Sequence, residues 1–429
     1  MGRRSPLRLL LLCTGLCILA AVALGIGVGE SIATRTAKAR TPTAASPHEA
    51  LAPAAATGAF GLDLMHAMGG SENLVLSPDS VATALAMAGS GAAGQTAAQI
   101  ASVLHLKTPS SFTAIGALQG TIASEQAAAA QGDPKAPTLD LANALFLQGG
   151  FPLNPAFVSG LQEHFGAGPQ SVDFKGDLSG SLKTINEWVS DHTNGIIGQL
   201  FESLPEKTRL VLADAVYLKA SWLYPFTPGA TSPAPFHSPA GSSSVQFMHE
   251  TQRLRYGSGR GYAAVDLPYR ASTLSLLVVL PVGRSLGAPQ HQLATSGLAG
   301  VVHGLSPKLV QLSLPRFHLR TQTSLNQALE ALGMRAAFSE AADFSGITAA
   351  EQLKIALVEH AADFKVDEAG TEAAAATGVV VEPTSAEVGR PPHAVVFNAN
   401  HPFLFFLRDD RTGAVLFAGR LNNPASAGV

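Results

Sequence analysis

Two segments of the chain have apolar residues at the spacing of amphipathic helices. The first opens at Ser77-Pro-Asp-Ser80, where a hydroxyl residue suited to an N-cap is followed by an early proline. The second covers Ser181 to Gly195 and ends in Asn-Gly, a common helix stop. The apolar faces consist of Val81, Leu85 and Ala88 in the first segment and of Leu182, Ile185 and Val189 in the second.

Strand patterns dominate the middle and the end of the chain. They are short runs of β-branched and aromatic residues bounded by Pro, Gly or Asp. These runs are Leu210 to Lys219, Leu274 to Leu280, Val310 to Leu314, Ala394 to Phe397, Phe403 to Arg408 and Val415 to Gly419. The mixture predicts an α+β fold with large sheets. From about Gly58 onward no low-complexity linker or internal repeat interrupts the sequence, which favours a single domain.

The N-terminal region has a different pattern. After MGRRSPLR, the run from Leu9 to Gly29 carries no charge and as a helix would span about 31 Å, close to the hydrocarbon thickness of a bilayer. Residues 1–30 are therefore interpreted either as a cleaved secretory signal peptide or as a retained membrane anchor. Residues 31–57, rich in Ala, Thr and Pro, predict a flexible tether. Both interpretations place the rest of the chain outside the cytoplasm, secreted or held at the outer membrane face.

Charge and cysteine content exclude several classes of function. Lys plus Arg (28) nearly balances Asp plus Glu (31), so the chain has no basic field for nucleic acid. Both cysteines, Cys13 and Cys17, lie in the N-terminal apolar run, which excludes disulfides and thiolate chemistry from the rest of the chain. The histidines are scattered, and no metal site or cofactor is expected.

One motif suggests an enzyme. Gly283-Arg-Ser285-Leu-Gly287 fits the nucleophile-elbow pattern of hydrolases and directly follows a predicted strand. Pro281 interrupts the exit from that strand, and short Gly/Ser patterns arise by chance in a chain with 42 glycines. No histidine and acid stand at hydrolase spacing, so an ordinary surface loop is the competing interpretation.

The segment from Asp367 to Ser385 (DEAGTEAAAATGVVVEPTS) has divided preferences. With a period of two, its odd-numbered positions from Thr371 to Val381 form a face without charge, while Glu372 and Glu382 fall on the other face. Four consecutive alanines favour a helix, whereas the flanking Gly, Pro and Ser favour a loop. We predict a segment with two conformations, one of them a strand within a sheet. The alternative is a solvated alanine-rich linker.

At this point the sequence resembles the serpins, the serine protease inhibitor family, from about Phe60 to Pro424. The segment Gly370-Thr-Glu-Ala373 through Ala376 is similar to the hinge of the family's reactive loop. Four further segments agree in order: Asn73 to Ile100, Ile185 to Leu200, Ala342 to Ile347 and His401 to Gly419.

The resemblance implies a single metastable α+β domain over 58–429, with three sheets, about nine helices and an exposed reactive-centre loop in the region 366–397. It implies that a target serine protease attacks the loop and forms an acyl-enzyme, after which the cut loop inserts into the main sheet and distorts the protease. Such a protein is an inhibitor and not an enzyme. The hinge residues are Glu368, Gly370, Thr371, Glu372, Ala373, Ala374, Ala375 and Ala376. Thr371 to Ala376 contain no proline and no bulky side chain, and Thr371 is the inward-facing entry residue, which suggests an inhibitory member.

Counting along the loop as in the family places the scissile bond between Thr384 and Ser385. A small residue before that bond suggests elastase-like or subtilisin-like proteases. Arg390 is the competing trypsin-like bait, but Pro391 follows it and makes the bond a poor substrate. The stretch from Ser385 to Phe397 looks longer than is usual in the family, so the choice between these bonds stays open.

The resemblance also assigns residues that gate insertion. Ser77, Ser80, Asp214 and His360 match the shutter under the main sheet, and Trp222 matches a tryptophan near the entry point, the breach. Asp214 departs from the asparagine usual in the family. Beside His360 it would make the gate sensitive to pH through an ion pair; alternatively, it is solvated or capped.

The expected partner is a target serine protease held in a covalent acyl-enzyme complex. The protein is expected to be a monomer, and neither nucleic acid nor heparin is expected as a partner. The alternative function is that of a non-inhibitory serpin-fold binding protein.

Overall fold

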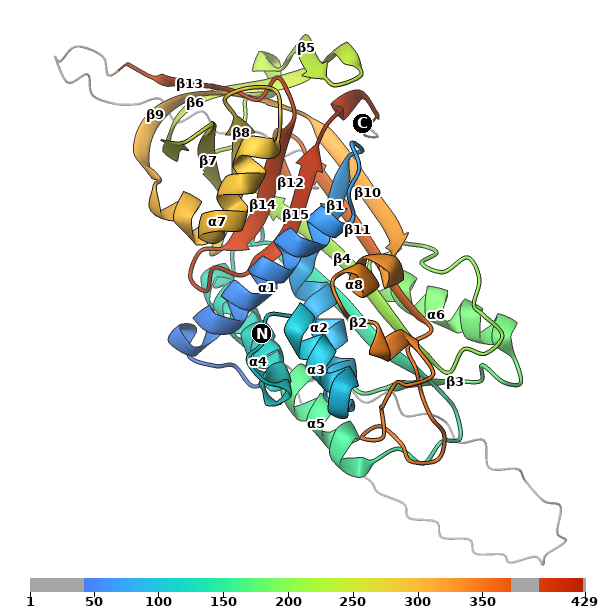
Figure 1. Cartoon of the computed structure of the whole chain (residues 1–429). Helices are drawn as coiled ribbons and strands as arrows, with labels where there is room; N and C mark the ends of the chain where they lie inside the picture. The colour runs from blue at the N-terminus through green and yellow to red at the C-terminus, as the bar shows by residue number, and fades with distance from the viewer. Residues whose placement is uncertain (1–41, 372–392, 427–429) are drawn as a thin grey trace, which may run out of the picture. The chain divides into compact units, whose positions relative to one another are not determined.

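The computed structural model describes residues 42–371 and 393–426, which contain eight α-helices and fifteen strands (Figure 1). The helices are α1 (Pro47–Ala67), α2 (Pro78–Gly89), α3 (Gly94–Val103), α4 (Phe112–Ala130), α5 (Pro155–Phe165), α6 (Leu178–His192), α7 (Gly287–His303) and α8 (Asn326–Ala331). The strands are β1 (Leu74–Leu76), β2 (Thr138–Gln148), β3 (Gln170–Val172), β4 (Leu210–Ser221), β5 (Ser232–Ser238), β6 (Gly241–Gly259), β7 (Tyr262–Pro268), β8 (Leu274–Pro281), β9 (Ser306–Pro315), β10 (Phe317–Ser324), β11 (Leu357–Val366), β12 (Gly370–Thr371), β13 (Val395–Asn398), β14 (Phe403–Asp409) and β15 (Val415–Leu421). The predicted α+β class is confirmed.

The strands of the described residues form two hydrogen-bonded sheets, not three. The larger has the order β1-β15-β14-β8-β7-β6-β9-β13, with β5 paired to β6, and the smaller has the order β10-β11-β12-β4-β2-β3. The difference arises from β6, whose 19 residues pair with β5 at its start, with β9 in the middle and with β7 at its end. One long strand thus joins what would otherwise be separate sheets.

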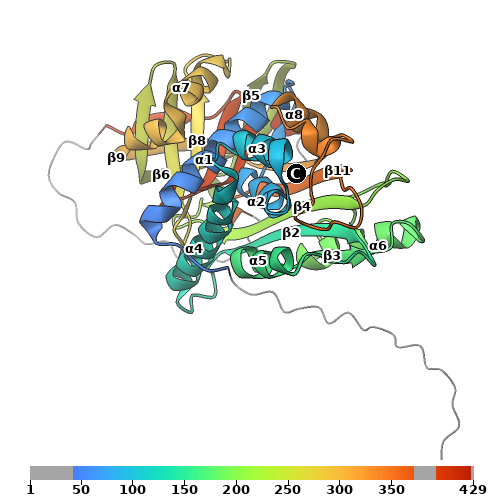
Figure 2. The same cartoon turned by 60° about the horizontal axis from the view of Figure 1, so that its bottom comes forward.

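The six-stranded sheet is covered by helices on both sides, with α2 and α6 on opposite sides of β2 and β4 (Figure 2). Because successive side chains of a strand point to opposite faces, Leu210 and Leu212 of β4 join the core around α2. Val211 and Ala213 instead pack with Ile185 of α6. Asp214, which follows them with the same period of two, therefore lies on the α2 side of β4.

Helix α1 begins well before the predicted start of the folded domain. Ser46 caps it in a capping box with Glu49, and Ala50 and Ala54 are fully or almost fully buried. The tether predicted over 31–57 is therefore wrong from Pro47 onward. Two of the alanines that suggested a tether, Ala50 and Ala54, are core residues, and α1 packs against α4.

In the described part of the chain, no helix combines the length and the apolar character needed to cross a bilayer. The uncharged run from Leu9 to Gly29 lies outside the described residues, so its interpretation as a signal peptide or an anchor stays a prediction.

Candidate functional site

Two residues of the predicted hinge are already part of the six-stranded sheet, which corresponds to the main sheet of the resemblance. Gly370 and Thr371 form β12, which lies between β11 and β4, with Thr371 opposite Val366 on one side and Ala220 on the other. Beyond this point β11 and β4 pair directly with each other, in parallel. The sheet is therefore separated at one end only, and two residues of the loop fill the gap.

The close fit of this short strand explains the glycine. Gly370 has φ +156°, and a Cβ at this position would collide with the carbonyl oxygen of Ala220. Thr371 is fully buried, and its hydroxyl lies 2.5 Å from the hydroxyl of Tyr269, which follows β7. A glycine and a small hydroxyl residue thus suit a position between two strands.

The segment from Asp367 to Ala369, which includes the first hinge residue, is held by backbone and indole groups. The Trp222 backbone N–H donates to Ala369 O (3.0 Å), and its indole N–H donates to Asp367 O (2.8 Å). The Phe226 N–H donates to Glu368 O (2.9 Å). Trp222 therefore lies beside the chain that leads into β12, and its role at the entry point of the loop stays a prediction.

Glu368 adds an ion pair to this breach. Arg316 Nε lies 2.8 Å from Glu368 Oε1, and the Thr231 hydroxyl donates to the same oxygen. Burial raises the pKa of Glu368, but the hydrogen bonds from Arg316 and Thr231 outweigh burial and leave the pKa below its ordinary value. Glu368 is therefore held as a carboxylate at neutral pH.

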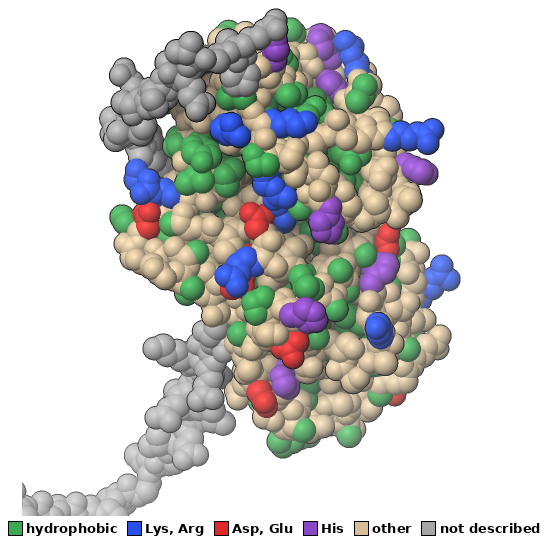
Figure 3. Space-filling model, turned by 90° about the vertical axis from the view of Figure 1, so that its left-hand side faces the viewer, with side chains coloured by type: hydrophobic (Ala, Val, Ile, Leu, Met, Phe, Trp, Pro, Cys, Tyr) green, Lys and Arg blue, Asp and Glu red, His purple; other side chains and the backbone are tan. Residues whose placement is uncertain are grey.

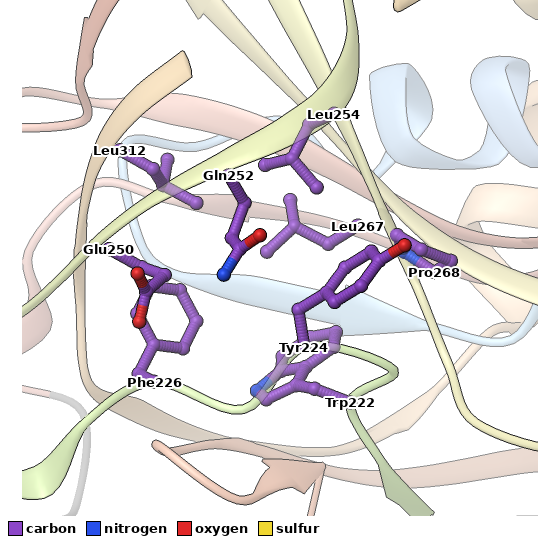
Figure 4. A pocket seen from close by; sticks show the side chains of 9 residues that line it. All are labelled: Trp222, Tyr224, Phe226, Glu250, Gln252, Leu254, Leu267, Pro268 and Leu312. Carbon is purple, nitrogen blue, oxygen red and sulfur yellow. The ribbon is translucent and has the colours of Figure 1, made fainter. Parts of the chain in front are cut away.

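A small pocket opens beside Trp222 (Figure 4). Its walls are Trp222, Tyr224, Phe226, Glu250, Gln252, Leu254, Leu267, Pro268 and Leu312. The space inside is about 20 Å³, enough for about one water molecule. This pocket is too small to hold a carried organic ligand in this conformation.

The four predicted shutter residues lie together between the sheet and α2. The Ser77 N–H donates to His360 Nε2 (3.2 Å), and the Ser80 N–H donates to Ser77 Oγ (3.3 Å). His360 Nδ1 hydrogen-bonds Asp214, its neighbour in register across β11 and β4. Asn143 of β2 completes the group. In the amide orientation in which its nitrogen donates and its oxygen accepts, the nitrogen lies 2.7 Å from Asp214 Oδ2.

These contacts exclude one interpretation of Asp214. Its side chain is fully buried, so the solvated alternative is wrong, and the contact with His360 is present. Because His360 Nε2 accepts from Ser77, the hydrogen-bond pattern assigns the ring proton to Nδ1, facing Asp214. A second proton on His360 would face the Ser77 N–H and break this bond. That the cluster acts as a gate stays a prediction.

A second buried carboxyl group lies in the first turn of α2. Asp79 is fully buried; Gln119 donates to its Oδ2, and its Oδ1 has no hydrogen-bond partner within the described residues. Burial raises the pKa of Asp79 to about 7, with a smaller contribution from the negative charge of Asp214. The sequence pattern around Asp79 indicates only a helix start, because an acid in a first turn is usually exposed.

The structure leaves several predicted residues without a description. Glu372, Ala373 to Ala376, Thr384, Ser385 and Arg390 lie outside the described residues. Ser285 is exposed, and its hydroxyl accepts from the Gly287 N–H (3.2 Å), with no histidine or carboxylate bonded to it in the described ranges. Within those ranges no three His, Cys, Asp or Glu side chains gather to hold a metal ion.

Four site residues could not be recognised from the sequence: Arg316, Thr231, Tyr269 and Asn143. They come from four different strands or loops, far from the hinge along the chain. No local pattern marks them, because their partners are set by the sheet register and not by spacing.

Comparisons with known proteins agree with this geometry. Residues 55–424 match the family model described as Serpin (serine protease inhibitor). An uncharacterized serpin-like protein from Thermococcus kodakarensis is 35% identical, over 86% of this chain and 85% of the relative. The leukocyte elastase inhibitor of Bos taurus is also 35% identical, over 82% and 93% of the two chains. The native-state crystal structure of the thermophilic serpin Tengpin superposes with a TM-score of 0.77 at 25% identity, covering 90% of this chain and 97% of that one.

Proposed function

Because this chain belongs to the serpin family, we propose that it inhibits extracytoplasmic serine proteases as a suicide substrate. The serine Oγ of the protease attacks the carbonyl carbon of the bait residue, the amine of the next residue leaves, and an acyl-enzyme results. The loop then inserts between β11 and β4 and pulls the protease with it. Deacylation requires an intact oxyanion hole in the protease, so deacylation stalls when the protease is distorted.

The observation that carries the proposal is the docked hinge. Gly370 and Thr371 already form β12, and the next residues of the loop would extend it by separating β11 from β4. About ten new backbone hydrogen bonds at about 1 kcal/mol each would yield on the order of 10 kcal/mol. This is comparable to the stability of a whole domain and sufficient to drive the movement.

We propose Thr384-Ser385 as the bait bond and an elastase-like or subtilisin-like protease as the target. The support is the small residue before the bond and the 35% identity to a leukocyte elastase inhibitor. Cleavage near Arg390 would instead indicate a trypsin-like target. Residues 1–30 would direct the protein to the cell exterior, as a cleaved signal or as a retained anchor.

We further propose that the inhibitor acts as a monomer, without heparin or nucleic acid. On the face drawn in Figure 3, the Lys and Arg side chains are scattered among acids and histidines, with no continuous basic stripe. This distribution supports inhibition without a polyanion.

The alternative is a serpin fold that binds a ligand without trapping a protease. An open surface pocket of about 510 Å³ between α4 and the start of α1 favours it, because a pocket of this volume has room for a small ligand. Ser124, Glu125 and Arg411 are among the residues that line the pocket.

Replacement of Thr371 by Arg distinguishes the proposed inhibitor from the alternative ligand-binding protein. The buried position cannot accept the charged side chain, so insertion stalls and the protease hydrolyses the acyl-enzyme. We expect the wild-type protein to inactivate an elastase-type protease at close to one molecule per protease. The Thr371→Arg variant should be cleaved without inactivating it. Equal inactivation by both proteins would contradict the proposed mechanism.

A further inference from the structure

A tyrosine from the nine-stranded sheet reaches the hinge in the six-stranded sheet. Tyr269 follows β7, and its hydroxyl lies 2.5 Å from Thr371 Oγ1. Both side chains are buried, with exposed fractions of 2% and 0%. The bond therefore joins two sheets at the point where the loop enters.

Contacts other than the bond to Thr371 hold the ring of Tyr269 in place. It stacks on Trp222 with a centroid distance of 4.4 Å and an interplanar angle of 18°. The Tyr269 backbone N–H donates to Leu274 O (3.0 Å). Since Trp222 is itself bonded to Asp367 O, ring, indole and hinge form one connected group.

This hydrogen bond exists only when the hinge is docked. If Thr371 left the sheet, its hydroxyl would be solvated, whereas the Tyr269 hydroxyl would lose the partner it has in a buried site. A buried hydroxyl without a partner is unfavourable. The bond thus favours the docked state over an expelled one, which is the condition for shifting an equilibrium between them.

We propose that Tyr269 is a positioning residue that keeps Thr371 docked between β4 and β11, so that insertion starts from a preformed first step. The proposal rests on the proposed function for its consequence in inhibition. Without the bond, a cut loop must first dock again before it can extend β12. The protease then has more time to deacylate, and a larger fraction of the inhibitor is consumed as substrate.

The first test needs no protease. Amide hydrogen exchange of a peptide covering Ala369 to Thr371 is compared between the full-length wild-type chain and Tyr269→Phe, which keeps the ring and its stacking. We expect about fivefold faster exchange, which corresponds to about 1 kcal/mol. Tyr262→Phe, at the start of β7 and 8% exposed, is the matched control and should exchange like the wild type.

A double-mutant cycle identifies the partner. Thr371→Val removes the same bond from the other side, so the double variant should exchange no faster than either single variant. Additive effects, or exchange unchanged in Tyr269→Phe, would overturn the proposal.

The second test uses an elastase-type protease. Tyr269→Phe should consume several-fold more inhibitor molecules per inactivated protease than Tyr262→Phe; equal consumption would overturn the role in inhibition. If even the wild type traps no protease, the proposed function fails, while hydrogen exchange still decides whether Tyr269 holds the hinge.

Discussion

At the scale of single residues, the carboxyl group of Asp79 makes the stability of the fold depend on pH. The pKa of Asp79 is raised from 3.8 to about 7, so the folded state favours the protonated carboxyl group. Ionisation of this group therefore destabilises the folded state. The wild type should lose stability as the pH rises from about 4 to about 7. Asp79→Asn removes the charge and should increase the free energy of unfolding by up to about 4 kcal/mol at pH 8, but by little at pH 4.

Urea unfolding at several pH values measures this difference. Asp191→Asn, on an exposed position of α6, is the control and should leave the pH dependence unchanged. A stability difference between Asp79→Asn and the wild type that is constant from pH 4 to pH 8 would disprove the assignment.

At the scale of elements, the ion pair of Glu368 with Arg316 joins the end of β11 to the turn between β9 and β10. Arg316→Met leaves the Glu368 carboxylate, with 8% of its side chain exposed, without its cation. We expect a loss of about 2 kcal/mol at pH 7, because a buried charge without a partner is costly.

The pH dependence and a matched control test this interpretation. The pKa of Glu368 is lowered, so the contribution of the pair is present above about pH 4.5 and disappears as the pH falls through the folded-state pKa. The wild type and Arg316→Met should therefore converge in acid. Lys354→Met, which breaks an exposed pair with Glu340 (88% exposed), should cost less than about 1 kcal/mol. If Arg316→Met lost as little stability as Lys354→Met, the assignment would be contradicted.

Elements with a clear period could be predicted from the sequence, and those set by packing could not. α2, α6 and β4 follow from repeated apolar positions and, for α2, a cap at Ser77. α1 was missed because its buried face includes alanines, which resemble a linker. The union of the sheets through β6 depends on pairing between distant strands, which no local pattern records.

The same distinction holds for the site. The family resemblance indicated Thr371, Asp214 and His360, and the structure brings the last two into contact. Tyr269 and Arg316 could not be predicted, because each contacts the hinge region only through the register of a distant strand.

For the whole molecule, the proposed function requires a second conformation besides the described one. Two loop residues occupy the sheet, and the uncharged face that begins at Thr371 is suited to continue as a central strand. On the proposed mechanism, extension of β12 by the cleaved loop releases the free energy that traps the protease.

The most direct test of this account is to mix the purified chain with an elastase-type or a subtilisin-type serine protease, run a denaturing gel and sequence the released C-terminal peptide. The account predicts a denaturant-stable band at the summed mass of the acyl-enzyme complex and a peptide that begins at Ser385. Cleavage without a stable band against every protease tried would contradict it, because the loop would then be cut without trapping the protease.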